Sequence, residues 1–267
     1  EGLGRHVSVF VTPDGTSAVL LAEDAKRTIR VRTLEAQYYR AALREPWGKH
    51  HLDGNLGTFW SGASCRDIST VMPYSRITGH ASTLAEQVIA SSASERARIG
   101  VWQRVPESGA VTAYNVSVHP ERCFPCDALI MYIDGGLEDH LRSLRKVHSP
   151  KETGGVLLGY HDFNVNAIVA VDALPAPPDS WSTRASFERG VAGLADAVNE
   201  ASRRTAGIVG YIGEWHSHPP GHSALPSQDD LRQLIYLTLG MQEDGLPAVQ
   251  LIVGETDLQV VLGMVKA

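Results

Sequence analysis

Residues 207–231 read GIVGYIGEWHSHPPGHSALPSQDDL, and this stretch decides both the fold and the candidate site. Residues 207–214 are mostly apolar, which predicts a strand that is covered on both faces. Pro226 and Ser227 are typical of a helix start, so we expect a capped helix over residues 227–239. A segment rich in histidine joins the two elements. The stretch therefore predicts a buried strand, a polar connection and a helix in immediate succession.

Two histidines directly follow the predicted strand. His216 and His218 are two positions apart, and in an extended chain such side chains point to the same side. Both imidazoles can then meet one metal ion, and Asp229 or Asp230 from the following helix would supply a third ligand. Three protein ligands and one open position are typical of a catalytic zinc site. A His-x-His pair alone is also common at an exposed strand end, so the assignment depends on the surrounding residues.

Farther upstream, residues 152–159 read ETGGVLLG, in which a glutamate precedes an apolar run that predicts another buried strand. Together with His-Ser-His-Pro at 216–219 and Ser-Gln-Asp-Asp at 227–230, this order resembles the JAB metalloproteases, also called MPN-plus or JAMM proteins. Their motif is an upstream Glu, then His-x-His-Pro, then Ser-x-x-Asp. The resemblance covers residues 127–267. It implies the JAB/MPN, cytidine-deaminase-like sandwich, which is an α/β fold with a mixed sheet and flanking helices.

The resemblance also implies a role for each residue of the motif. These roles are zinc binding for His216, His218 and the aspartate, proton transfer for Glu152, and stabilisation of the tetrahedral intermediate for Ser227. Elementary chemistry agrees with them. Zinc lowers the pKa of its bound water from about 15.7 to roughly 7, and a carboxylate that is not a ligand must then take the proton. Ser227 also has a purely structural interpretation as the helix N-cap, and the two roles are compatible.

Asp229 and Asp230 are the two candidates for the third metal ligand. The Ser-x-x-Asp spacing from Ser227 selects Asp230, whereas the commoner loop length of the resembled family, counted from His218, selects Asp229. An insertion in the loop 219–226 disturbs less structure than a change within a capped helix turn. We therefore prefer Asp230.

A function follows from the same resemblance. The chain would be a zinc-dependent isopeptidase or peptidase that cleaves after the C-terminus of a ubiquitin-like protein in a bacterial conjugation system. Its implied partners are the ubiquitin-like protein, the conjugates of that protein and an E2-like protein. The alternative is a non-catalytic interaction module attached to an E1-like activating enzyme. Non-catalytic relatives typically lose metal ligands, and every ligand position is filled here, which favours the enzyme.

The rest of the second half alternates strands with helices, which predicts an α/β fold. The expected helices are 136–147 and 187–203, and the expected strands are 154–160, 167–173, 248–253 and 258–265. Just before this region, Cys123 and Cys126 form a Cys-x-x-Cys, which is half of a structural zinc site. The chain has no second cysteine pair. We therefore expect a surface pair, or a metal site completed by histidines, rather than a redox motif.

The first half predicts a separate, smaller α/β segment. Its expected strands are 6–11, 17–21 and 99–103, and its expected helices are 34–43 and 83–91, the latter capped by Thr83. Residues 62–67, GASCRD, resemble the later part of a ThiF or E1-like domain, a type that occurs fused to JAB domains in bacteria. No nucleotide-binding glycine loop precedes them, so we expect no adenylation activity. Cys65 is either a thioester nucleophile or a partly buried structural cysteine.

These patterns predict an E1-like fragment at 1–112, a linker at 113–126 and the JAB domain at 127–267. A net charge of −6 without a basic patch argues against nucleic acid as a partner. The sequence contains no apolar run of the roughly 18 residues that a membrane span needs. Three cysteines are too few for a disulfide framework, which favours the cytoplasm. Because the first residue is Glu rather than Met, we expect the chain to be part of a longer protein.

Overall fold

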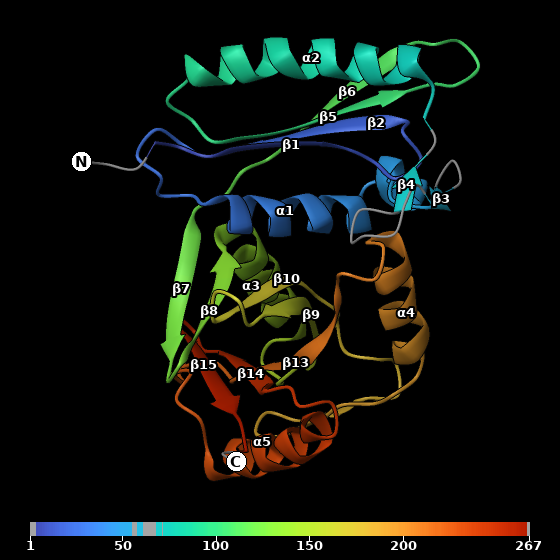
Figure 1. Cartoon of the computed structure of the whole chain (residues 1–267). Coiled ribbons are helices and arrows are strands. Elements are labelled where there is room, and N and C mark those ends of the chain that lie inside the picture. Colours follow the sequence, from blue (N-terminus) through green and yellow to red (C-terminus); the bar gives the residue numbers. More distant parts are fainter. Residues whose placement is uncertain (1–3, 55–57, 61–67, 71, 266–267) are drawn as a thin grey trace. The chain divides into compact units, whose positions relative to one another are not determined.

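The computed structural model describes residues 4–54, 58–60, 68–70 and 72–265. The chain forms two compact units (Figure 1). The first comprises Glu1–Pro120 and Arg203–Ala206, and the second comprises Glu121–Ser202 and Gly207–Ala267.

The first unit is built on a four-stranded antiparallel sheet in the order β1-β2-β5-β6. Figure 1 shows helices α1 and α2 on opposite faces of this sheet. Strand β2 is buried along its whole length because it lies between the two helices. The elements are β1 (Val7–Val11), β2 (Ser17–Ala22), α1 (Val31–Arg44), the 3-10 helix η1 (Pro46–His50), β3 (Thr58–Trp60), β4 (Ile68–Thr70), α2 (Tyr74–Ser92), β5 (Arg98–Arg104) and β6 (Val111–Val116).

Helix α2 begins at Tyr74, well before the start that the sequence predicted at Thr83. Thr83 lies inside the helix, where its hydroxyl donates a hydrogen bond to the Gly79 carbonyl at 3.1 Å. Threonine can bond the carbonyl four residues back as well as cap a helix, so the residue type alone did not locate the start.

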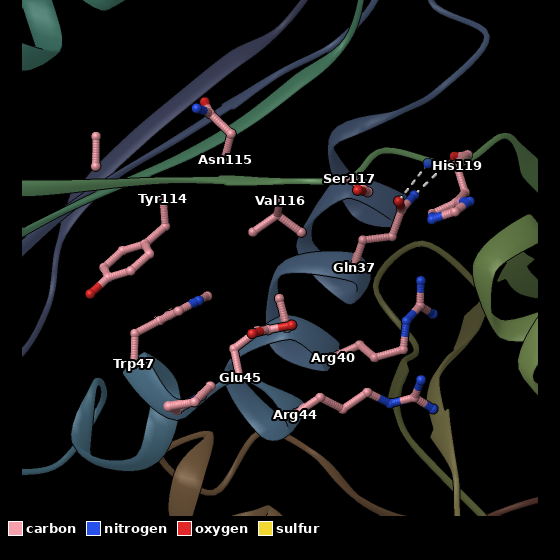
Figure 2. Close-up of a pocket in the computed structure, with 13 residues that line it drawn as sticks. Gln37, Arg40, Arg44, Glu45, Trp47, Tyr114, Asn115, Val116, Ser117 and His119 are labelled. Atoms are coloured by element: carbon pink, nitrogen blue, oxygen red, sulfur yellow. Dashed lines mark hydrogen bonds between the residues drawn. The ribbon is translucent and has the colours of Figure 1, made fainter.

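A cavity of about 590 Å³ lies between α1 and β6 in the first unit (Figure 2). Tyr114 of β6 stacks on Trp47, with ring centroids 5.6 Å apart. Elsewhere in the lining, the Gln37 side chain accepts a hydrogen bond from the His119 N–H at 2.7 Å and donates one to the His119 carbonyl at 3.0 Å. The chain that leaves β6 is thereby held against α1. None of the sequence-predicted site residues that the structure describes lines this cavity.

The second unit is a mixed seven-stranded sheet with helices, in the order β15-β14-β13-β9-β10-β8-β7. Strand β13 lies inside this sheet, antiparallel to β9 and parallel to β14. The elements are β7 (Glu121–Cys126), β8 (Leu129–Asp134), α3 (Gly135–His148), β9 (Gly154–Asp162), β10 (Ala167–Ala173), β11 (Trp181–Ser182), β12 (Phe187–Glu188), α4 (Leu194–Arg204), β13 (Gly210–Ser217), α5 (Gln228–Gln242), β14 (Ala248–Val253) and β15 (Leu258–Gly263).

Helices α3 and α5 cover opposite faces of this sheet. Val249 and Leu251 of β14 belong to the same apolar cluster as Leu137 and Leu141 of α3. Ala248 instead belongs to the cluster that α5 forms. Because neighbouring residues of a strand point to opposite faces, β14 is covered on both sides. This strand is the parallel neighbour of β13, so the histidine-bearing strand lies next to the packed core.

Two predicted segments differ from the structure. Residues 113–126 do not form a linker, because β6 and β7 occupy most of them. Strand β7 pairs with β8 at the edge of the seven-stranded sheet. Pro125 suits such an edge, where one side of the strand needs no sheet partner.

The helix expected at 187–203 begins only at Leu194. Residues 187 and 188 pair with β11 instead and form a hairpin. The Asp179 carboxylate then accepts hydrogen bonds from the N–H groups of Val191 and Ala192, both at 3.0 Å, which holds them in a loop. Among the helices that the structure describes, none combines the length and the apolar character that crossing a bilayer requires.

Candidate metal centre

Strand β13 presents both histidines at the end of the strand. It continues through Ser217, so His216 lies inside the strand rather than after it, and His218 follows the last strand residue. His216 is 7% exposed. Gly213 permits β13 to approach β14 closely, because a side-chain carbon there would lie 2.0 Å from the Val249 carbonyl oxygen. Packing of the two strands therefore fixes the backbone just before the histidines.

Helix α5 brings Asp230 to the histidines through its N-terminal cap. The Ser227 hydroxyl accepts a hydrogen bond from the Asp230 N–H at 3.2 Å, and Asp230 Oδ2 accepts one from the Ser227 N–H at 2.6 Å. This reciprocal pair is a capping box. It holds the Asp230 carboxylate 3.0 Å from His216 Nε2 and 3.3 Å from His218 Nε2.

The ring of His218 is held from its other side. Its Nδ1 donates to the Ser223 carbonyl at 2.6 Å, which leaves Nε2 as the atom that faces Asp230. Such a bond is typical of metal-binding histidines because it fixes the tautomer and the ring orientation. Arg145 of α3 donates from Nε to the His218 carbonyl at 3.0 Å. Both the ring and the backbone of His218 are thus supported.

The ligand atoms of His216, His218 and Asp230 all lie within 4.8 Å of one another. Across the described residues, no other group of three such side chains reaches this spacing. His216 Nε2 is buried and makes no hydrogen bond within the described part of the chain, although Asp230 Oδ1 is 3.0 Å away. A buried nitrogen without a hydrogen-bond partner is suited to a cation. The three side chains therefore fit a divalent metal ion.

Charge interactions favour the ionised form of the carboxylate. Burial alone would raise the pKa of Asp230, but the two imidazoles and the Ser227 N–H hold that pKa well below its usual range. The hydrogen bond to Asp230 in turn raises the pKa of His218. A proton therefore competes with a cation for the His218 ring.

Asp229, the alternative ligand, has a different environment. Its side chain is 87% exposed and forms an ion pair with Arg232 at 2.8 Å. Arg232 belongs to the same helix, so this pair is a surface contact of α5. The geometry favours Asp230 as the third ligand.

Glu152 lies beside the cluster without joining it. Strands β9 and β13 pair in a register that sets Gly154 opposite His216, which brings Glu152 close to the histidines. Its N–H donates to the Thr183 carbonyl at 2.8 Å. Burial raises the pKa of the Glu152 carboxyl, and His216 and His218 oppose this only in part. A carboxyl with a raised pKa beside a metal site is suited to take up and release protons.

The cluster opens into a cavity of about 350 Å³, whose lining includes Glu152, both histidines and Ser227. One wall is formed by residues 184–187, which are part of the turn between β11 and β12 and the first residue of β12. Phe187 packs against Gly154, where a side-chain carbon would meet the ring at 2.6 Å. The cavity is therefore closed on this side by a hairpin that contacts the strand beside Glu152.

The cysteines are not part of this site. Cys123 and Cys126 lie three residues apart on β7, so they point to opposite faces of the strand. The Cys126 thiol donates to the Phe124 carbonyl at 3.3 Å. This arrangement does not support the predicted half of a zinc site. Cys65 lies outside the described residues.

Two features of the site were not predicted from the sequence. One is the hairpin of β11 and β12 that forms a wall of the cavity, called the hairpin wall below. The other is the hydrogen bond from Arg145 of α3 to the His218 carbonyl. The available signal for the hairpin was WSTRASF at residues 181–187, in which two aromatic residues flank a polar turn. No comparable signal marked Arg145, because a basic residue near the end of a helix usually lies in solvent.

Comparison with known proteins supports a JAB domain in the second half of the chain. Residues 136–262 match the family of prokaryotic homologs of the JAB domain. A CD-NTase/cGAS isopeptidase of Enterobacter hormaechei subsp. hoffmannii is 37% identical over 103 residues, which cover 39% of this chain and 55% of that protein.

Two further relatives are less similar. A probable metalloprotease of Sinorhizobium fredii is 29% identical over 106 residues, which cover 40% of this chain and 63% of that protein. A CD-NTase/cGAS isopeptidase of Escherichia coli is 28% identical over 119 residues, which cover 44% of this chain and 72% of that protein. The chain thus spans 55% and 63% of the lengths of the first two relatives.

Proposed function

We propose that this chain is a zinc-dependent peptidase of the JAB type that cleaves after the C-terminus of a ubiquitin-like protein. The observation that carries the proposal is the group of His216, His218 and Asp230 in a cavity that also contains Glu152. The names of the relatives, isopeptidase and probable metalloprotease, support the same class of reaction. The segment that matches the JAB family contains all four residues.

His216, His218 and Asp230 would hold the zinc ion. Two imidazole nitrogens and one carboxylate oxygen suit zinc and leave one position open. When bound, the ion lowers the pKa of water and polarises the substrate carbonyl. The Ser223 carbonyl and the Arg145 guanidinium would keep His218 in the ligand geometry.

Glu152 would move the protons of the reaction. Its carboxylate takes a proton from the attacking water and passes it to the nitrogen of the leaving amine. A raised pKa suits both steps, because the group must accept a proton and then release it. The Ser227 oxygen accepts the Asp230 N–H, which leaves its hydroxyl hydrogen able to donate to the substrate carbonyl oxygen.

The hairpin wall offers a place for an extended tail. Strands β11 and β12 form a two-stranded sheet whose turn lines the cavity. An extended segment can pair with a strand edge through main-chain hydrogen bonds. Small residues at the end of the tail, above all glycine, would allow the closest backbone approach. The folded body of the ubiquitin-like protein would provide most of the affinity.

The test is cleavage of ubiquitin-like proteins that carry a C-terminal extension. Candidate fusions are incubated with the chain as prepared, after treatment with a chelator, and after zinc is added back. We expect cleavage at the end of the ubiquitin-like sequence, which the chelator abolishes and zinc restores. A zinc-loaded protein that cleaves none of the fusions would contradict the peptidase and favour a non-catalytic interaction module.

A second comparison tests the class of substrate. The intact fusion is compared with a peptide that carries only the last residues of the ubiquitin-like protein and the extension. We expect a clearly higher kcat/KM for the fusion. Equal values would show that the folded partner is not recognised and that the chain is a general peptidase.

A further inference from the structure

Glu214 is a buried carboxylate that bonds to Gln233 in the lining of the candidate site, and none of the proposed steps uses it. It lies on β13 two residues before His216, and therefore on the same side of the strand. Its side chain is 7% exposed. Burial of an ionised group is costly unless partners satisfy it, so the partners of Glu214 indicate why it is there. Its two oxygens are bound by residues from two different segments of the chain.

One oxygen holds the hairpin wall. Arg189 directly follows β12 and donates from Nε to Glu214 Oε1 at 2.9 Å, with a second guanidinium nitrogen 2.7 Å from the same oxygen. The hairpin in turn contacts the proposed proton carrier, since the Thr183 carbonyl accepts the Glu152 N–H at 2.8 Å. The position of this wall, and of the Glu152 backbone, is thus tied to Glu214.

The other oxygen holds the first turns of α5. Gln233 donates from Nε2 to Glu214 Oε2 at 2.9 Å. Gln233 lines the cavity and follows Asp230 by three residues, which is nearly one helical turn. Gln250 Nε2 of β14 donates to Gln233 Oε1, the side-chain amide oxygen, at 3.5 Å. The carboxylate therefore joins β13 to the helix that carries the third ligand.

We propose that Glu214 is a positioning residue for the cleavage reaction. It sets the hairpin wall and Glu152 relative to the ligands on β13 and α5. The inference rests on the proposed function of this site. The alternative is an ion pair that only affects folding. Buried ion pairs often add little net stability, and such a pair would leave the reaction of the folded protein unchanged.

The experiment compares Glu214→Gln with Glu138→Gln in the full chain. Glutamine keeps the shape of the side chain but removes the charge that Arg189 pairs with. Glu138 is a matched control because its side chain is 14% exposed and pairs with Arg122 and Arg142 away from the cavity. For each protein we would measure zinc content, Tm, kcat and KM on an extended ubiquitin-like fusion, and hydrogen exchange of residues 181–189.

We expect Glu214→Gln to keep one zinc per chain and to lose roughly 10- to 100-fold in kcat/KM, because a misplacement of about 1 Å can cost 10²-fold. Hydrogen exchange of the hairpin should become faster. Arg189→Gln should give the same loss, and the double variant should add little, because the two residues act as a pair. Glu138→Gln should leave kcat/KM within about twofold, even at a similar decrease in Tm.

An unchanged kcat/KM in Glu214→Gln, or an equal loss in Glu138→Gln, would overturn the proposal. Loss of zinc from Glu214→Gln would also overturn it, because the residue would then act on metal binding. Failure of the proposed function is visible separately, as absence of cleavage by the zinc-loaded wild-type chain. In that case there is no reaction to position, and hydrogen exchange tests only the structural part of the proposal. Faster exchange of the hairpin in Glu214→Gln but not in Glu138→Gln shows that Glu214 holds the hairpin, and unchanged exchange contradicts it.

Discussion

At the scale of single residues, the side chains of His216 and His218 are expected to determine whether a metal ion is bound. His216→Ala and His218→Ala each remove one of the three proposed ligands, so each should release most of the zinc, and the double variant should release all of it. Zinc per chain is measured after dialysis against a weak chelator. The same measurement in a Cys123→Ser/Cys126→Ser background accounts for any zinc at the cysteines. Full zinc retention in the double histidine variant would disprove the assignment.

The two neighbouring aspartates provide a matched pair. Asp230→Asn should weaken zinc binding at least tenfold, because it removes the charge of the proposed ligand that lies within 3.3 Å of both imidazoles. Asp229→Asn should have no such effect, since the side chain of Asp229 is 87% exposed. Competition with a fluorescent zinc chelator measures both affinities. The opposite order of effects would make Asp229 the ligand.

Proton transfer is assigned to a residue outside the group of ligands. Glu152→Gln should keep the zinc and the thermal midpoint but lose roughly 10²- to 10⁴-fold in kcat, because the amide cannot carry the proton. Zinc analysis and steady-state kinetics on the same preparation separate the two effects. Turnover close to that of the wild type would refute the role of Glu152.

At this scale the grouping of His216, His218 and Asp230 was predictable from the sequence, for a physical reason. The spacing of His216 and His218 fixes their common side through strand geometry alone. The choice of Asp230 also follows local rules, because its place in the helix is set by the Ser227 cap. Glu214 was not predicted as part of the site. Its two partners, Arg189 and Gln233, lie 25 and 19 residues away in the chain, and no local sequence pattern connects them to Glu214.

At the scale of elements, the start of α5 connects folding to the site. Ser227→Ala removes the cap and should cost about 1 kcal/mol of stability, and it should also weaken zinc binding by loosening Asp230. Ser227→Asn can still cap the helix but has no hydroxyl. It should keep stability and zinc near the wild-type values and lose activity if the hydroxyl contacts the substrate. Urea unfolding, zinc affinity and kcat are compared, and equal activity in wild type and Ser227→Asn would leave Ser227 with the capping role alone.

Elements were predictable where local pattern and tertiary structure agree. The apolar run that became β9 and the amphipathic pattern that became α3 agree with their predicted ranges to within two residues at each end. The hairpin of β11 and β12 was hidden, because each of its strands is two residues long and too short for any periodicity. The predicted range of helix α4 began too early for a similar reason. The Asp179 side chain holds the loop before α4, and it lies 12 residues before Val191, to which it bonds.

At the scale of the whole chain, the order of strands could not be derived from one sequence. Strands β9 and β13 are separated by more than 45 residues, yet their pairing sets Gly154 opposite His216 and thereby brings Glu152 to the cluster. Pairing over such a separation depends on the fit of whole faces, which local propensity does not encode. The E1-like interpretation of the first unit stays a prediction, because the family match begins only at residue 136.

The first unit carries a pH-sensitive group of its own. His51 is fully buried, and its ring lies 4.9 Å from that of Trp47 and 5.7 Å from that of Tyr38, measured between centroids. Burial lowers the pKa of His51 from 6.5 to about 4, and the negative charge of Asp14 offsets this only in part. Since the folded pKa lies below the unfolded one, the unfolded chain binds a proton first as the pH falls.

The contribution of neutral His51 to the free energy of unfolding of the first unit should therefore be complete above about pH 6.5. It should decrease by up to about 3 kcal/mol as the pH falls toward 4. Urea unfolding followed by tryptophan fluorescence at several pH values measures this slope, with Trp47 as the neighbouring reporter. His51→Leu should flatten the slope even where it lowers stability overall, because the titrating group is gone. His6→Leu is the control, since His6 is exposed in the same unit and its replacement should leave the slope unchanged. An equal slope in wild type and His51→Leu would show that other groups cause the loss of stability.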